Sequence, residues 1–368
     1  MWRNVLAVGL VAAVGVAALV DTLRGGAPVE EPAGTATESL AQEAENTLAG
    51  PDVPAPGALS GSLVVAEADG CQLRVVAFAT ASIGDPGPGS LCRVWVSPAG
   101  DLAVVATDRG DRSDAREIVL VRLGNPSEVV ESLGQARGEI AWEPNGDRLA
   151  WCAPDGTSIV FRVEGGTRER VEGCRARFAS DGAVLTRPDR PLAAEILRNG
   201  ERLLGPDEIA DGFEQGSTGP VDVLDFAVAS DGRLAVTATR TAPLGTVVVL
   251  EVWQDGLEAA FELPTRLGPG NTRFGGFLLF SPAGSELAIG YSPGAGELTL
   301  VDLELGRLLI RSTPQRALGW SPDGAWLALA TGNDVRIYGA LKDEPSYVLP
   351  LAAASLGWTS WEEPSDEG

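Results

Sequence analysis

One short pattern recurs six times along the chain and constrains the fold more than any other feature. In each copy an apolar stretch runs into a four-residue turn that ends in glycine, and a second apolar stretch follows. The turns are rich in Pro, Asp, Asn and Gly. Proline presets φ, the side chains of Asp and Asn hydrogen-bond to the backbone nearby, and glycine accepts φ > 0. A turn of this kind closes an antiparallel hairpin. The six turns are Ser97–Gly100, Glu143–Gly146, Ala179–Gly182, Ala229–Gly232, Ser281–Gly284 and Ser321–Gly324.

The spacing of these turns predicts the architecture. Their glycines follow one another at intervals of 46, 36, 50, 52 and 40 residues, and a period of roughly 40–50 residues filled with short strands is typical of propeller blades. Six turns give six blades, and a seventh comes from a hairpin at Ser62–Phe78 together with Ser355–Trp358, which repeats the pattern of Ala317–Trp320. We predict an all-β propeller of seven four-stranded blades, with six as the alternative. The carboxy-terminal strand would pair into the first blade, which removes the open sheet edges.

The strand that precedes Ser321-Pro-Asp-Gly324 and the apolar strand after it resemble the repeat of the TolB-type, WD-like β-propellers. The likeness covers about residues 60–361. It implies an interaction scaffold in the cell envelope, and it implies nothing about a particular ligand.

Composition narrows the possible functions. The net charge of −23 argues against nucleic acid or an anionic membrane surface as a partner, because both require a basic surface. The chain has no histidine, so Ser-His-Asp and Cys-His catalysis and histidine metal ligands are excluded. Its four cysteines lack CxxC spacing, and we expect neither a metal site nor a cofactor.

The amino-terminal residues predict a membrane segment. Asn4–Val20 is uncharged and almost entirely apolar, somewhat shorter than the roughly 20 residues of a full transmembrane helix. We interpret residues 1–24 as an uncleaved signal-anchor, with a cleaved signal peptide and a secreted protein as the alternative. Because Arg3 would stay cytoplasmic, the rest of the chain would lie outside, anchored to the membrane through this helix only. Residues 25–60 read as an acidic Pro/Ala/Gly linker, 61–361 as the propeller, and 362–368 as an acidic tail.

When the repeats are aligned on their turn glycine, residues at the same distance before that glycine form a register. One such set of positions belongs to the core, and another is charged. Four and six residues upstream the side chains are almost all apolar, as the period-2 face between blades requires. Seven residues upstream, four successive blades carry alternating charge, near the start of the innermost strand. We expect either a chain of inter-blade ion pairs or a polar, partly cationic mouth for an anionic or peptide ligand. The candidate ligand-binding residues are Arg93, Glu139, Arg175, Asp222, Asp225, Arg273 and Arg316.

The same alignment pairs the cysteines. Cys92 and Cys174 both lie eight residues before a turn glycine, and Cys71 and Cys152 both lie between the second and third strands of the preceding blade. These two positions are neighbours on one face of a propeller. We predict the disulfides Cys71–Cys92 and Cys152–Cys174, which fit an oxidising compartment.

Three functions remain open. The first is an extracytoplasmic scaffold that binds an envelope protein, a peptide or a glycan at the mouth. The second is a glycoside hydrolase-like enzyme that uses paired carboxylates such as Glu139 and Asp225. The third is a structural spacer without a partner. A hydrolase requires carboxylates that are not paired with arginine. Whether the carboxylates at the mouth form such pairs therefore discriminates between the scaffold and the hydrolase.

Overall fold

The computed structural model describes residues 53–361 apart from the gaps 56, 69–71, 80–81, 84–90, 108–114, 125–126, 191–192, 211–220, 243–244, 268–276, 291–297, 312–316, 332, 340–341 and 343. The chain divides into Met1–Glu43 and Ala44–Gly368, and every described residue belongs to the second unit. The predicted membrane segment, most of the linker and the acidic tail lie outside the described residues. Within the described part, no helix combines the length and the apolarity needed to cross a membrane.

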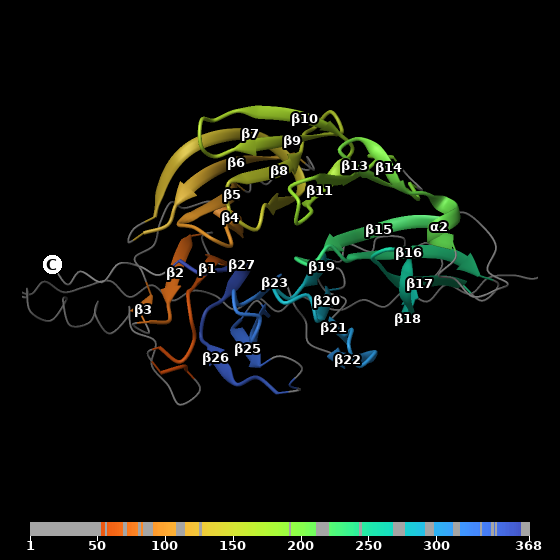
Figure 1. Cartoon of the computed structure of the whole chain (residues 1–368). Coiled ribbons are helices and arrows are strands. Elements are labelled where there is room, and N and C mark those ends of the chain that lie inside the picture. Colours follow the sequence, from red (N-terminus) through yellow and green to blue (C-terminus); the bar gives the residue numbers. More distant parts are fainter. Residues whose placement is uncertain are drawn as a thin grey trace, which may run out of the picture. The chain divides into compact units, whose positions relative to one another are not determined.

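The described residues form antiparallel sheets, labelled in Figure 1. The first sheet joins the two ends of the domain and has the order β27 (Ala353–Thr359), β1 (Ser62–Glu67), β2 (Leu73–Ala77), β3 (Ser82–Ile83). The second has seven strands, namely β4 (Leu91–Val96), β5 (Leu102–Thr107), β6 (Ala115–Arg122), β7 (Glu128–Trp142), β8 (Arg148–Cys152), β9 (Thr157–Arg162) and β10 (Arg168–Glu172).

Four more sheets of four strands follow in chain order. The first contains β11 (Cys174–Phe178), β12 (Val184–Arg187), β13 (Ile196–Arg198) and β14 (Glu201–Leu204), and the second contains β15 (Val221–Val228), β16 (Leu234–Ala242), β17 (Gly245–Trp253) and β18 (Leu257–Leu267). The third contains β19 (Phe277–Phe280), β20 (Glu286–Gly290), β21 (Leu298–Asp302) and β22 (Arg307–Arg311). The fourth contains β23 (Ala317–Trp320), β24 (Trp326–Ala330), β25 (Val335–Gly339) and β26 (Tyr347–Leu349). One short helix, α2 (Pro206–Ala210), follows β14.

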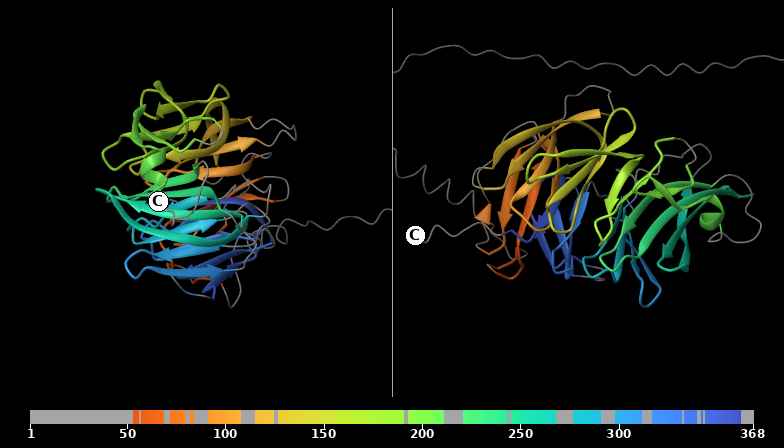
Figure 2. Two further views of the ribbon diagram at one scale, coloured as in Figure 1. Left: turned by 90° about the vertical axis from the view of Figure 1, so that its right-hand side faces the viewer. Right: turned by 45° about the horizontal axis from the view of Figure 1, so that its top comes forward.

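The seven-stranded sheet arises because β7 serves two hairpins. Its first part, up to Arg137, pairs with β6, and its second part, from Arg137 to Trp142, pairs with β8. The register shifts between Arg137 and Ile140, where Gly138 has a φ of 70°. A side chain with a Cβ adopts that φ only with strain. β7 is therefore the last strand of one four-stranded set and the first strand of the next. Figure 2 shows the same sheets from two further sides.

The repeated turns form as their sequences predict. In five of them the glycine N–H donates to the carbonyl three residues earlier, as from Gly324 to Ser321 at 2.9 Å, and the same five glycines have φ between 73° and 92°. The turn at Gly100 differs, because its glycine is not in the left-handed region. Each turn closes a hairpin whose first strand is the first strand of a four-stranded set.

Among the residues that the structure describes, seven hydrophobic clusters hold the sheets together, and each one combines residues of two consecutive four-stranded sets. One cluster joins the last sheet, through residues such as Ala328 and Ile337, to β1 and β27 of the first sheet. The predicted core register six residues before the turn glycine is buried throughout, at Val94, Ile140, Ala176, Phe226, Leu278 and Leu318. Burial between sheets, rather than within one, is the main stabilising contribution.

The innermost strands also contact one another directly. Trp142 on β7 donates its indole N–H to the carbonyl of Trp95 on β4 at 2.9 Å, and Trp320 on β23 donates to Leu279 on β19 at 3.3 Å. Ser355 on β27 exchanges hydrogen bonds with the backbone of Val94 on β4. These contacts align the starts of the innermost strands at one end and the glycine turns at the other. We call these ends the mouth end and the turn end.

Candidate ligand-binding surface at the mouth end

Ion pairs join the charged register across neighbouring innermost strands. Arg93 Nη1 lies 3.8 Å from the carboxylate of Glu139, and that carboxylate also accepts a hydrogen bond of 2.6 Å from the indole of Trp95. Arg175 lies 3.3 Å from Asp225. No ion pair joins Glu139 to Arg175 within the described residues, so the predicted chain of pairs divides into two separate groups.

Asp225 is the buried centre of the second group. Its side chain is 3 % exposed, and the same oxygen, Oδ1, faces Arg175 at 3.3 Å and Arg177 at 3.6 Å. Neither contact has hydrogen-bond geometry, and Oδ1 has no other partner among the described residues. A buried carboxylate needs compensating charge. Here two guanidinium groups supply it at distances longer than the 2.7–2.9 Å of a charge-assisted hydrogen bond.

A second pair lies beside it. Arg187, at the end of β12, contacts Asp222 of β15 at 3.2 Å. Burial lowers the pKa of Arg187 and raises the pKa of Asp222, and in each case the attraction between the two opposes the effect of burial without cancelling it. Arg175 acts electrostatically on both groups. We call Arg175, Arg177, Arg187, Asp222 and Asp225 the mouth cluster.

The backbone of Arg175 is unusual. Its φ is 55°, a left-handed conformation that costs a residue with a Cβ about 1–2 kcal/mol. The residue lies in an irregularity of the β11–β12 ladder between Cys174 and Arg177. The predicted disulfide Cys152–Cys174 is present, with the two Cα atoms 4.9 Å apart, and it ties the preceding residue to β8. The disulfide and the ion pair with Asp225 together hold Arg175 in place.

Asp189 completes the surroundings of the disulfide. Its carboxylate lies near the sulfurs of Cys152 and Cys174, a combination that could ligate a metal. However, metals bind thiolates, and these sulfurs are bonded to each other. Asp189 instead accepts a hydrogen bond of 2.8 Å from Arg137. The disulfide and this hydrogen bond explain why the three side chains lie together, and no metal ion is needed.

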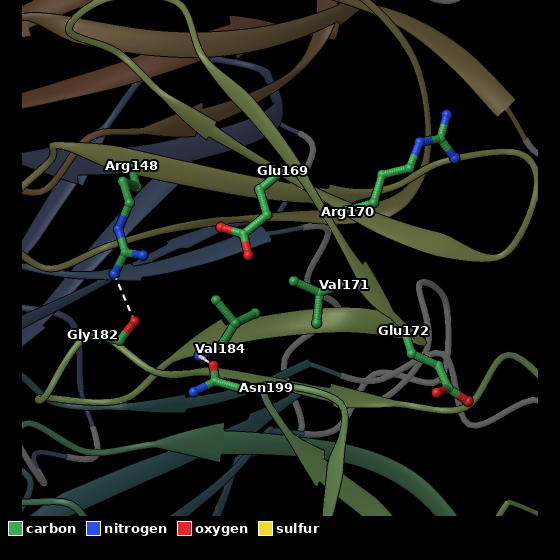
Figure 3. Close-up of a pocket in the computed structure, with 8 residues that line it drawn as sticks. All are labelled: Arg148, Glu169, Arg170, Val171, Glu172, Gly182, Val184 and Asn199. Atoms are coloured by element: carbon green, nitrogen blue, oxygen red, sulfur yellow. Dashed lines mark hydrogen bonds between the residues drawn. The ribbon is translucent and has the colours of Figure 1, made fainter.

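A groove of about 190 Å³ lies away from the mouth cluster, between β10 and the start of β12. Figure 3 shows Arg148 reaching the carbonyl of Gly182, and Asn199 accepting a hydrogen bond from the backbone of Val184. Arg148 also binds Glu143 through two hydrogen bonds of 2.8 and 2.6 Å, which raise its pKa. Its donors are used within the chain, so we assign Arg148 a structural role.

The structure leaves some predicted residues untested. Arg273, Arg316 and Cys71 lie outside the described residues, as does the side chain of Cys92. The mouth cluster in turn contains two residues that the alignment missed. The hairpin register could have found Arg187, because counting back from the turn at Gly182 sets it opposite Arg175. Period-2 alternation could have found Arg177 too, because residues 175 and 177 share one face of a strand. That both arginines meet one carboxylate could not be read from the spacing.

No family model and no curated protein matches this chain. Among solved structures it is similar to the β-propeller domain of Cps50 (Swd1) from Myceliophteria thermophila, with 12% identity, 72% of this chain and 87% of that chain covered, and a TM-score of 0.49. It is also similar to a putative 6-phosphogluconolactonase from Bacteroides fragilis, with 15% identity, 81% and 98% coverage, and a TM-score of 0.50. The second likeness concerns the fold alone, and the propeller resemblance predicted from the turns is confirmed.

Proposed function

We propose that this chain is a membrane-tethered β-propeller outside the cytoplasm that binds an envelope protein, a peptide or a glycan through the mouth cluster. The observation that carries the proposal is the buried carboxylate of Asp225 between Arg175 and Arg177, beside the pair of Arg187 and Asp222. Propellers bind at the end where several innermost strands bring side chains together, because residues from different blades converge there. Strained backbone, as at Arg175, also gathers at functional sites.

Seven blades, closed by the carboxy-terminal strand, form part of the proposal. Dividing β7 between its two partners gives seven four-stranded sets, and seven hydrophobic clusters lie between consecutive sets. The pairing of β27 with β1, from Ser62 and Thr359 to Glu67 and Ala353, supports closure. We assign residues 61–361 to this domain.

The location outside the cytoplasm rests on the sequence and on the disulfide. The apolar run Asn4–Val20 with Arg3 before it favours a signal-anchor. The bond between Cys152 and Cys174 fits an oxidising compartment. The start of β1 and the end of β27 lie at the turn end, where Ser360 donates to the carbonyl of Pro98. A tether joined to β1 would therefore leave the mouth end free for a partner.

The hydrolase alternative has weaker support. Each carboxylate of the predicted site that the structure describes faces an arginine: Glu139 faces Arg93, Asp222 faces Arg187, and Asp225 faces Arg175. A glycosidase needs one carboxyl that holds a proton and one that reaches a sugar or water. The burial of Asp225 opposes the second requirement, and the arginine beside each of the other two carboxylates competes with a substrate for it.

Affinity capture tests the proposal. The full-length chain is used as bait in envelope extracts, and the experiment is repeated with Arg93→Glu and Arg175→Glu combined. We expect a specific partner to be captured by the natural chain and lost with the double variant. Arg170→Glu, a charge reversal at a 65 % exposed side chain of β10, is the control and should retain it. A set of captured proteins unchanged by the double variant would contradict binding at the mouth.

A further inference from the structure

The donors and acceptors of the mouth cluster do not balance, and the imbalance indicates what the cluster binds. Arg175, Arg177 and Arg187 each carry five N–H donors. Arg177 donates a hydrogen bond of 2.9 Å to the carbonyl of Ala176, and Arg187 donates to Asp222 at 3.2 Å and to the carbonyl of Arg190 at 3.4 Å. The contacts of the three arginines with Asp222 and Asp225 lie at 3.2–3.6 Å, beyond the usual length of a charge-assisted hydrogen bond. Arg187 Nε is buried and has no acceptor among the described residues.

The arginine at the turn end provides the contrast. Arg148 binds Glu143 at 2.8 and 2.6 Å and the carbonyl of Gly182 at 2.6 Å. The guanidinium of Arg148 is therefore engaged by acceptors of this chain at short distance. The guanidinium of Arg175 has one long contact, and its side chain is 41 % exposed. Its remaining donors are accessible to an acceptor from outside.

Charge decides which acceptor fits. The cluster contains three guanidinium groups and two carboxylates, hence a net charge of +1 in a chain whose total is −23. One further monoanion neutralises the cluster, whereas a dianionic phosphate would leave a negative charge in a strongly acidic protein. A carboxylate also matches the planar fork of arginine through two parallel hydrogen bonds.

We propose that the mouth cluster binds a single carboxylate group of a peptide partner, and that Arg175 is the residue that contacts it. The inference rests on the proposed function and names the chemistry of its ligand. Arg177 and Arg187, which are 18 % and 14 % exposed, stay behind Arg175 and keep Asp225 and Asp222 neutralised while the ligand binds. The fixed backbone of Arg175 lowers the entropic cost of recognition, because the guanidinium is already positioned.

The test uses a small probe with one carboxylate. N-acetyl-glutamate α-amide is titrated into the full-length chain at constant ionic strength, and binding is followed by calorimetry. N-acetyl-glutamine α-amide is the uncharged probe of the same shape, and inorganic phosphate is the dianionic one. We expect saturable binding of the glutamate probe, at least tenfold tighter than that of either of the others.

Variants assign the binding to Arg175. Arg175→Gln should weaken the glutamate probe at least tenfold, and Arg175→Lys, which keeps the charge but loses the fork, should weaken it less. Arg170→Gln removes the same charge from β10 and should change the affinity less than twofold. Unfolding temperatures show that each variant is folded. Equal loss in Arg175→Gln and Arg170→Gln, or tighter binding of phosphate, overturns the inference.

The two proposals fail in different ways. If Arg175→Gln abolishes capture of the partner but the glutamate probe does not bind, the carboxylate inference is wrong and the binding mouth remains. If the probe binds through Arg175 and capture does not depend on the mouth, the carboxylate site stands and the proposed function is wrong.

Discussion

The environment of each arginine decides what it contributes. At the turn end, hydrogen bonds to Glu143 and Asp231 raise the pKa values of Arg148 and Arg233, so each charge is held by an acceptor of the same hairpin. At the mouth, burial lowers the pKa of Arg187, because the guanidinium is desolvated more than its partner compensates. The first group stabilises turns. The second is costly to bury, which is typical of residues retained for binding.

Asp155 offers a test of these local contacts. Thr157 and Arg170 donate hydrogen bonds to its carboxylate and lower its pKa from 3.8 to about 2. Since the folded-state pKa is depressed, the stabilisation is present above the unfolded value and is lost as the pH falls through about 2. We expect Asp155→Asn to be less stable than the natural chain above pH 4, and the difference to disappear as the pH falls below about 2.

Carbon NMR of the Asp155 side chain measures this directly, with a titration midpoint expected near pH 2. Thr157→Ala should raise the midpoint, because it removes the largest contribution to the shift. A midpoint near 4 in the natural chain would show that the contacts do not form.

Gly357 marks the closest approach of two innermost strands. A Cβ at this position would lie 2.5 Å from Cγ2 of Val96 on β4. We expect Gly357→Ala to destabilise the fold by about 1–3 kcal/mol, the usual range for overpacking. Denaturant unfolding measures the change, and Gly256→Ala, where a Cβ meets nothing within 4 Å, is the control. Adding Val96→Ala to Gly357→Ala should restore part of the lost free energy of unfolding. If the effects of the two substitutions simply add, the contact between these residues is refuted.

At the scale of elements, the glycine turn explains how much of the fold the sequence predicts. Turn chemistry is local, so six hairpins and their register follow from Pro, Asp, Asn and Gly alone. That register brought Arg93 to Glu139 and Cys152 to Cys174. It could not show that Arg175 and Arg177 meet the same oxygen of Asp225, because the start of β11 departs from regular pairing. Such departures depend on tertiary contacts, here the disulfide and Asp225, which no local pattern encodes.

Two turns make a matched test of that chemistry. Gly324 has φ +73°, whereas Gly100 occupies the same place in its turn without a left-handed φ. Gly324→Ala should cost about 1–2 kcal/mol through its backbone alone, since the nearest atom to a Cβ there is 3.5 Å away. Gly100→Ala should cost less in the same unfolding experiment. Equal losses would mean that the turn conformation does not limit stability.

The disulfide stabilises the start of β11. It closes a loop with a sequence separation of 22 residues, for which the chain-entropy model gives about 3 kcal/mol. We expect the double variant Cys152→Ser/Cys174→Ser to lose a free energy of unfolding of this size in denaturant titrations. Reducing agent should lower the stability of the natural chain and leave that of the double variant unchanged. A loss with reductant in the variant would point to another bond.

At the scale of the molecule, the two ends of the innermost strands differ in chemistry. At the turn end, short polar contacts join neighbouring turns, such as Arg148 to the carbonyl of Gly182 at 2.6 Å and Arg233 to the carbonyl of Gly284 at 2.9 Å. The mouth end concentrates long ion pairs around a buried carboxylate. The charged register in the sequence predicts that the two ends differ. Whether a charged side chain binds a ligand or a residue of the neighbouring strand depends on side-chain distances, which the spacing of residues cannot supply.

Site-specific photo-crosslinking in cells tests most directly whether the mouth is the binding surface. A photoreactive residue replaces Arg190, an exposed side chain next to the mouth cluster, or Ser180, in the turn at the other end of the same hairpin, roughly 17 Å away. Neither position belongs to the cluster. The account predicts a crosslinked partner from position 190 that disappears with Arg175→Gln, and none from position 180. Crosslinking from position 180 alone, or from position 190 irrespective of Arg175, would contradict it.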